Sequence, residues 1–381
     1  MRIAIVDDNA TNLLIIEKIL QKAGYTKLAT ASSAMELFDI LELDEPNATE
    51  PPVSLILMDL MMPGIDGIEA CRRIQESERY RDIPVIFVTA LGDSNKLAEA
   101  LDAGAIDYVM KPINKVELLA RIRSALRLKY EKDWHRERDQ RISFELNLAK
   151  QVQRSILSDP IDNDRVKIDA IYRPSSELAG DFYAWYCLGG GKYGVILLDM
   201  MGHGISSSLV CMYIYSALQD TIKSISDPEL VVLELNRRMM QLQGSNQLMN
   251  YYFTAIYYVL DTSEQTIEYV NAGHPAGIAF VDQKPQLLTE GCCALGFFDN
   301  IEVKKGTIAY RNQVKIVLYT DGLLDQIAKG QEDDVQQLQA RLGGNGEQLE
   351  DHVLNLFEGL GQVSQQDDIC LVTVETKGKA R

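Results

Sequence analysis

The sequence contains little histidine and no closely paired cysteines, and both absences restrict the metal sites it can build. It has four histidines, and its six cysteines are scattered with no CxxC pair. This pattern predicts neither a disulfide framework nor a zinc site, and it suits a reducing compartment. Any metal site is therefore expected to use carboxylates, which favour hard cations such as Mg²⁺ or Mn²⁺.

Positive charge and long apolar runs are also scarce. Lysine and arginine number 38 against 55 acidic residues, for a net charge of −17. This balance argues against nucleic acid or an anionic membrane as the main partner. No apolar run reaches membrane-spanning length, and the opening stretch MRIAIVDDNA has too few apolar residues for a signal peptide. We therefore expect a cytoplasmic protein with no nucleic-acid partner and no membrane partner.

The chain has 381 residues, which fits two domains and a connector. Its first 122 residues alternate short apolar runs with helical patterns. The runs lie at residues 3–6, 27–31, 53–58, 84–89 and 106–110. Five such β–α units predict a doubly wound, flavodoxin-like α/β domain with a parallel sheet. Ligands of such sheets bind beyond the carboxyl ends of the strands.

Polar residues stand at these predicted strand ends. Asp7 and Asp8 follow the first run, and Asp59 follows the third. Three carboxylates at one edge repel one another and favour a divalent cation between them. Thr89 and Lys111 end the fourth and fifth runs, and a hydroxyl and an ammonium group suit a phosphoryl group placed on Asp59.

Residues 1–122 resemble a response-regulator receiver domain. The resemblance rests on VDD at 6–8, MDLMMPGIDG at 58–67, TA at 89–90 and KP at 111–112. It implies a Mg²⁺ pocket at Asp7, Asp8 and Asp59, with Asp59 as the phosphoacceptor and Thr89 and Lys111 as its phosphoryl partners. Tyr108 lies where the family has a switch aromatic, and a plain core role is the alternative.

A helical connector is predicted over residues 123–160. Its apolar positions are spaced by three or four, weaken through the charged stretch EKDWHRERDQR, and then resume. The positions are Leu119, Ile122, Leu126, Tyr130 and Trp134, then Ile142, Leu146, Ala149, Val152 or Gln153, and Ile156. Such a long helix favours a coiled-coil homodimer. The alternative is a solvated tether whose ends pack on the two domains.

Residues 161–377 read as an α+β domain with two packed sheets flanked by helices. Centring a hairpin on Gly190 places Asp181 opposite Asp199, and Asp321 and the pair Asp367–Asp368 also stand at strand ends. Neighbouring carboxylates without histidine predict an oxygen-ligand site for two divalent ions. Such a centre suits hydrolysis of a phosphate ester by water.

This domain resembles the bacterial, SpoIIE- and RsbU-like branch of the PPM serine/threonine phosphatases. The matching motifs are LAKQVQRSIL, ELAGDFYAW, LLDMMGHG, NAGHP, LYTDGLLD and QDDICLVTV, in the family's order. The resemblance implies two Mn²⁺ or Mg²⁺ ions bridged by Asp199. The further ligands it implies are Asp181, Asp321, Asp367, the backbone carbonyl of Met200, and Asp368 if it exchanges roles with Asp367.

The residues around Asp199 depart from the family pattern, and the role of His203 has two interpretations. Leu198 stands where a glycine is usual, and Met200–Met201 replace Val-Ser, so we expect altered affinity or rate. His203 is either a general acid or a polar residue of a glycine-rich loop.

The sequence therefore predicts a response regulator in which phosphorylation of Asp59 controls a metal-dependent protein serine/threonine phosphatase. The resemblance implies a sensor histidine kinase or phosphotransfer protein as donor. It also implies a phosphorylated STAS-type anti-sigma factor antagonist as substrate in a partner-switching pathway. The alternative is a phosphorylation-gated adaptor without catalysis, which the intact acidic set disfavours.

Overall fold

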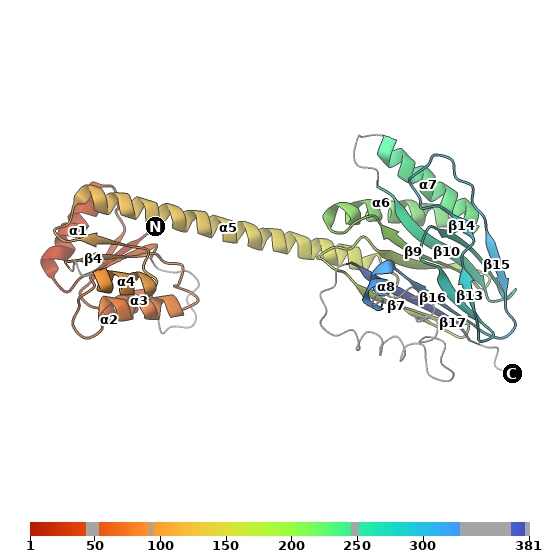
Figure 1. The fold of residues 1–381 in the computed structure, drawn as a ribbon, viewed down its shortest axis with the longest axis horizontal. Coiled ribbons are helices and arrows are strands. Elements are labelled where there is room, and N and C mark those ends of the chain that lie inside the picture. The colour runs from red at the N-terminus through yellow and green to blue at the C-terminus, as the bar shows by residue number, and fades with distance from the viewer. Residues whose placement is uncertain (43–52, 91–93, 245–250, 328–366, 378–381) are drawn as a thin grey trace. The chain divides into compact units, whose positions relative to one another are not determined.

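The computed structural model describes residues 1–42, 53–90, 94–244, 251–327 and 367–377. The chain separates into two compact units, Met1–Ile142 and Ser143–Arg381 (Figure 1). The division falls inside one helix. The three-part division predicted from the sequence, with a separate linker over 123–160, stays a prediction.

The first unit is a five-stranded parallel sheet with helices on both faces (Figure 1). The strand order is β2-β1-β3-β4-β5, as in flavodoxin-like folds. Its strands are β1 (Ile3–Val6), β2 (Leu28–Ala31), β3 (Leu55–Met58), β4 (Val85–Thr89) and β5 (Asp107–Met110). Its helices are α1 (Ala10–Lys22), α2 (Ala34–Leu41), α3 (Gly67–Glu76), α4 (Ser94–Asp102) and the first part of α5 (Lys115–Ser155).

Two apolar clusters cover the two faces of this sheet. Residues of α2, α3 and α4 pack on one face, and residues of α1 and α5 pack on the other. The strands β1, β3 and β4 are buried along their whole length, as strands of a parallel sheet covered on both faces should be. The predicted doubly wound fold is confirmed.

Helix α5 runs unbroken for 41 residues, from Lys115 to Ser155. Its first turns belong to the first unit, where Leu119 and Ile122 are buried in the core. Farther along, Asp82 accepts hydrogen bonds from Lys132 and Arg136, at 2.5 and 3.1 Å. These bonds lower the pKa of Asp82 and hold the helix to the first unit beyond its apolar contacts.

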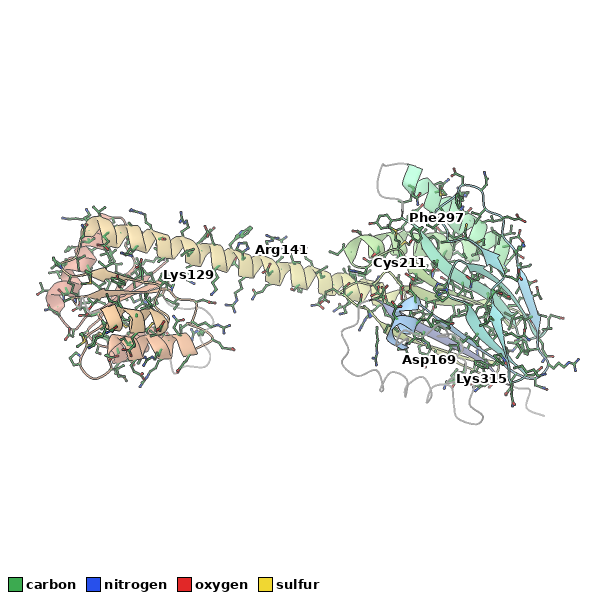
Figure 2. All side chains as sticks on the ribbon, in the orientation of Figure 1. Lys129, Arg141, Asp169, Cys211, Phe297 and Lys315 are labelled. Carbon is green, nitrogen blue, oxygen red and sulfur yellow. The ribbon has the colours of Figure 1, made fainter. Side chains whose placement is uncertain are left out.

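The middle of α5 is exposed, and Figure 2 shows its side chains around Arg141 projecting from the helix. Leu146 and Ala149 are half-buried, and Ile156, just after the helix, packs on the core of the second unit. Much of the predicted dimer seam therefore packs within one unit or the other. The predicted long helix is confirmed. None of the described helices is apolar enough over 18 residues to cross a bilayer.

The second unit consists of two six-stranded sheets and three described helices (Figure 1). The first sheet holds β8 (Phe182–Gly189), β9 (Lys192–Met200), β10 (Phe253–Asp261), β11 (Thr266–Ala272), β14 (Gly291–Cys292) and β15 (Gly306–Ala309). The second holds β6 (Ile161–Asp162), β7 (Val166–Arg173), β12 (Gly277–Val281), β13 (Lys284–Leu288), β16 (Val314–Tyr319) and β17 (Ile369–Thr376). The helices are α6 (Ile205–Ile222), α7 (Pro228–Gly244) and α8 (Asp321–Ile327).

The two sheets pack face to face over a shared apolar core. Helices α6 and α7 cover the outer face of the first sheet, and α8 packs on the outer face of the second. This layering confirms the predicted α+β architecture. The hairpin of β8 and β9 pairs Phe182 with Leu198, a register that continues to place Asp181 opposite Asp199.

Candidate functional site

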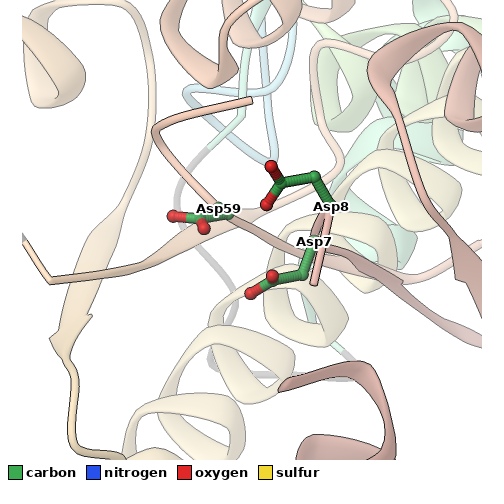
Figure 3. A group of neighbouring side chains, drawn as sticks. All are labelled: Asp7, Asp8 and Asp59. Carbon is green, nitrogen blue, oxygen red and sulfur yellow. The ribbon is translucent and has the colours of Figure 1, made fainter. Parts of the chain in front are cut away.

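Three carboxylates of the first unit meet at the carboxyl edge of the parallel sheet. One carboxylate oxygen from each of Asp7, Asp8 and Asp59 lies within 4.8 Å of the others (Figure 3). Asp7 is fully buried and Asp59 is 8% exposed, whereas Asp8 is exposed. Carboxylate oxygens from partly open positions are the ligands that Mg²⁺ takes while keeping several waters. The cluster fits a divalent cation.

Lys111 joins two of these carboxylates. Its Nζ lies 2.8 Å from Asp7 Oδ2 and 2.7 Å from Asp59 Oδ2. Desolvation by burial lowers the pKa of Lys111, but hydrogen bonds to Asp59 and Asp7 outweigh it, so its pKa is raised and it stays charged. The ammonium group is therefore fixed beside the carboxylate that the sequence predicts as the phosphoacceptor. Thr89, buried at the end of β4, accepts a backbone hydrogen bond from Lys111 at 2.7 Å.

Tyr108 stands on β5, half-buried, and packs against the core cluster of α2, α3 and α4. The Arg121 guanidinium lies 5.8 Å from the ring centroid. Both interpretations of Tyr108, switch and core residue, fit this position.

The second site lies where four segments from both sheets meet. Asp181 immediately precedes β8, Asp199 lies near the end of β9, Asp321 begins α8, and Asp367 precedes β17. Electrostatic interactions connect Asp181 to Asp199 and Asp367, and Asp199 to Asp321 and Asp367. The structure thus places Asp199 within electrostatic range of the other three predicted ligands, although no three of these carboxylates have oxygens within 4.8 Å of one another, as those of the first site do.

Two glycines allow the segments to approach this closely. A Cβ on Gly180 would lie 2.8 Å from the carbonyl oxygen of Gly202 and 3.1 Å from that of Met200. A Cβ on Gly322 would lie 2.1 Å from the carbonyl oxygen of Asp368. The glycines beside Asp181 and Asp321 are therefore required by packing. The close approach at Gly180 also brings the Met200 carbonyl next to the segment that bears Asp181.

Asp181 is the most buried of these four carboxylates, at 3% exposure. Its Oδ2 is buried and finds no hydrogen-bond partner among the described residues. Desolvation by burial and the charge of Asp199 raise the pKa of Asp181 well above its ordinary value, against a hydrogen bond from Thr320. A buried oxygen without a donor is costly in an apolar setting, and a bound cation would satisfy it.

The pKa values of Asp199 and Asp367 are also raised. Desolvation, together with the charges of Asp321 and Asp367, raises the pKa of Asp199 to about 8. Burial raises the pKa of Asp367 against a hydrogen bond from the Asp368 backbone, and exposed His203 slightly lowers it. Mutually repelling carboxylates with raised pKa values are the electrostatic mark of a site that holds cations. The donor set fits Mg²⁺ or Mn²⁺.

Asp368 differs from Asp367 in its contacts. Its Oδ1 accepts hydrogen bonds from Ser175 N and Ser175 Oγ at 2.7 and 2.8 Å, and its Oδ2 accepts one from Gly180 N at 2.7 Å. Both oxygens are thus engaged by the protein, which favours a structural role for Asp368 and the ligand role for Asp367.

His274 lies behind the site and shapes it. Its Nε2 donates to the Tyr319 carbonyl at 3.1 Å, so its Nδ1 accepts from Thr254 Oγ1 at 2.8 Å. Burial lowers the pKa of His274 to about 3, so the ring is neutral. Thr254 is the register partner of Asp199, and Tyr319 lies two residues before Asp321. One neutral histidine therefore connects β10, which pairs with the strand bearing Asp199, to β16, which leads into Asp321.

The two units match two known families. A family model described as a response regulator receiver domain matches residues 3–123, and one described as Stage II sporulation protein E (SpoIIE) matches residues 189–377. The chain joins a receiver domain to a SpoIIE-family domain of the PPM phosphatase fold. The resemblance seen in the sequence is confirmed for both parts.

Curated relatives match one part of the chain each. Phosphoserine phosphatase RsbP of Bacillus subtilis is 40% identical over 185 residues, which cover 48% of this chain and 46% of RsbP. The probable transcriptional regulator ycf27 of Cyanophora paradoxa is 41% identical over 126 residues, 33% of this chain and 48% of that protein. The chain thus spans about half the length of these relatives.

One solved structure supports the fold of the SpoIIE-family domain. The SiaA-PP2C domain of Pseudomonas aeruginosa superposes with a TM-score of 0.52 at 22% identity, covering 62% of this chain and 97% of that domain. At this identity the likeness concerns the fold alone.

Sequence reasoning missed the residues that support the aspartates. Thr320 hydrogen-bonds Asp181 and lies in the motif LYTDGLLD. A buried threonine beside a predicted metal-ligating aspartate has no distinctive spacing in a sequence. Gln153 was noticed only as an alternative seam position, although its buried side chain contacts the Asp181 loop. A polar residue at a buried helical position was the available signal.

The raised pKa values predict that the metal-free SpoIIE-family domain loses stability as the pH rises. The folded protein retains protons on Asp181 and Asp199 that the unfolded chain, with ordinary carboxyl values, has already released. The free energy of unfolding should therefore fall between the unfolded pKa of 3.8 and about 8, by up to ~1.4 kcal/mol per pH unit for each proton. Urea denaturation in EDTA at pH 5.5 and 8 measures this slope.

Asp199→Asn should flatten this dependence and stabilise the metal-free domain at pH 8, because it removes one of the repelling charges. Asp220→Asn, on the exposed face of α6 beside Lys223, serves as the matched control with no change of slope. A wild-type stability that does not vary with pH in EDTA would contradict the electrostatic account of the site.

Proposed function

We propose that the chain is a response regulator whose receiver controls a metal-dependent protein serine/threonine phosphatase. The observation that supports it most directly is the electrostatic interaction of Asp199 with Asp181, Asp321 and Asp367, together with a buried Asp181 oxygen that has no partner among the described residues. This arrangement favours a metal-dependent enzyme over an adaptor without catalysis.

We propose one Mg²⁺ at Asp7, Asp8 and Asp59 in the receiver. Two Mn²⁺ or Mg²⁺ ions would be held in the second domain by Asp181, Asp199, Asp321, Asp367 and the Met200 carbonyl. The ions would supply positive charge to a phosphate ester and activate water. The protein's part is to fix the carboxylates: Thr320 bonds Asp181, and Asp368 and the close-packed glycines set the loops.

The proposed substrate is a phosphoserine or phosphothreonine on a STAS-type anti-sigma factor antagonist in a partner-switching pathway. The similarity of residues 189–377 to the SpoIIE family and the likeness to the phosphoserine phosphatase RsbP support this class. The proposed phosphodonor is a sensor histidine kinase or a phosphotransfer protein, because Asp59 and Lys111 form the receiver constellation.

We further propose a homodimer formed through α5, along an exposed stripe that shares three positions with the predicted seam and adds two. Five large side chains are 46–73% exposed and fall within about 80° of one another at 3.6 residues per turn. They are Tyr130, Trp134, Phe144, Leu148 and Val152. An apolar stripe of this length on one helix is the kind of surface that a second copy of the helix covers.

Asp199→Asn should abolish metal-dependent turnover, because this carboxylate contributes to both proposed metal positions. Loss of a ligand should lower kcat/KM by at least about a hundredfold, more than loss of a supporting residue costs. The assay uses a phosphorylated STAS protein and p-nitrophenyl phosphate with Mn²⁺ or Mg²⁺. Asp220→Asn is the control. Full activity of Asp199→Asn would refute the metal assignment, and tight STAS binding without turnover by the wild type would favour the adaptor.

Receiver phosphorylation should change the phosphatase rate about fivefold or more, the usual range of coupling between two sites. Beryllium fluoride, which mimics an acyl phosphate on Asp59, is added to the full chain with Mg²⁺, and the rate on the STAS substrate is compared with and without it. Asp59→Asn should give one rate under both conditions. Equal rates of the wild type with and without the mimic would rule out control by Asp59.

Phe144→Glu with Leu148→Glu should weaken self-association, because the two charges would be buried in the proposed helix pair. Ile142→Glu changes an exposed apolar residue on another side of α5 and is the matched control. Sedimentation velocity of the full chain from about 1 to 50 µM measures the effect. A wild type that stays monomeric over this range would refute the dimer.

A further inference from the structure

The last turns of α5 make a two-pronged contact with the second domain. Gln153 is 5% exposed, and its side-chain amide pairs with the backbone of one residue. Its Nε2 donates to the Ala179 carbonyl at 2.7 Å, and its Oε1 accepts from the Ala179 amide at 3.1 Å. A buried amide whose donor and acceptor are both used in this way fixes the orientation of the peptide it contacts.

Ala179 is two residues from Asp181, and the backbone between them is held from the other side. The next amide, Gly180 N, donates to Asp368 Oδ2 at 2.7 Å, and a side chain on Gly180 would collide with the Gly202 carbonyl. The loop is thus held between Gln153 on α5 and Asp368 at the start of β17. The position of Asp181 follows from both contacts, because so short a backbone segment leaves it little freedom.

We propose that Gln153 is a positioning residue that makes the metal affinity of the Asp181 site depend on α5. This proposal rests on the proposed function of the second domain as a metal-dependent phosphatase. Asp181 is nearly buried and carries the oxygen without a partner, so it is the carboxylate whose placement a cation depends on most. Both hydrogen bonds between Gln153 and Ala179 form only when the last turns of α5 lie at the position seen here relative to the loop.

This contact is sensitive to small movements because hydrogen bonds act only over short donor–acceptor distances. A hydrogen bond weakens steeply beyond about 3.2 Å, so a shift or rotation of α5 by roughly 1 Å at Gln153 would open both bonds. Because α5 is one unbroken helix that begins in the receiver core, a change there has a covalent and continuous route to Gln153. The contact therefore gives α5 two discrete states, paired and unpaired, that differ at Asp181.

A second contact of α5 with the same loop provides the control. Lys150 lies one turn before Gln153, and its Nζ is 3.3 Å from Glu177 Oε2. Both side chains are exposed enough that this ion pair contributes little. Lys150→Ala therefore removes a contact between the same helix and the same loop without touching the amide pair.

The test compares Gln153→Met, Lys150→Ala and the wild type as full chains. Methionine keeps the volume of glutamine and loses both hydrogen bonds. Isothermal titration with Mn²⁺ should show about tenfold weaker binding for Gln153→Met and a change of less than twofold for Lys150→Ala. With p-nitrophenyl phosphate, kcat should fall at low Mn²⁺ and recover as Mn²⁺ approaches saturation, while KM stays near the wild-type value, because Gln153 is proposed to act through metal affinity and not to touch substrate.

Gln153→Glu covers the case in which the methionine variant does not fold. Its carboxylate can still accept from the Ala179 amide but cannot donate to the Ala179 carbonyl, so its Mn²⁺ affinity should also be reduced. Wild-type Mn²⁺ affinity in a folded variant would overturn the proposal, as would a variant that loses thermal stability alone. Wild type that binds Mn²⁺ without turnover would refute the phosphatase, while the affinity comparison would still decide the role of Gln153.

Discussion

Repulsion between carboxylates at strand ends is the constraint on which both domains depend. Each domain gathers acidic side chains where the backbone leaves a sheet, and each must balance their charge. In the receiver a side chain balances part of this charge, because the Lys111 ammonium group lies within 2.8 Å of both Asp7 and Asp59. In the SpoIIE-family domain burial, and then the charges of neighbouring carboxylates, raise the pKa of Asp199.

The two solutions suit two kinds of chemistry. A phosphoryl group on Asp59 brings its own negative charge, and a fixed ammonium group together with one divalent ion can accept it. Hydrolysis of a phosphate ester requires more positive charge at one place, and an all-acidic site supplies it only when cations are bound. The domain with the uncompensated aspartates is therefore the one whose stability and activity should both depend on metal.

The sequence predicted the parts of the site that follow from strand geometry. Centring the hairpin on Gly190 predicts Asp181 opposite Asp199, and the pairs from Phe182–Leu198 to Cys187–Tyr193 have that centre, although an irregularity shifts the register next to the turn. The pair Asp367–Asp368 could not be resolved in the same way. Two adjacent aspartates look alike in a sequence, and only the distant donors at Ser175 and Gly180 show that Asp368 is held by the protein.

The connector shows a second limit of periodicity. Spacing by three or four identified a long helix, but it could not say which side of the helix each domain would occupy. Leu119 and Ile122 pack in the receiver core, and polar Gln153 occupies a buried position near the other end. The spacing admits Val152 or Gln153 at this position, and only the structure shows that the amide is the buried one. In this chain the Gln153 amide is where α5 contacts the loop that carries Asp181. Signalling through α5 and metal binding at Asp181 would therefore both depend on the hydrogen-bonded peptide of Ala179.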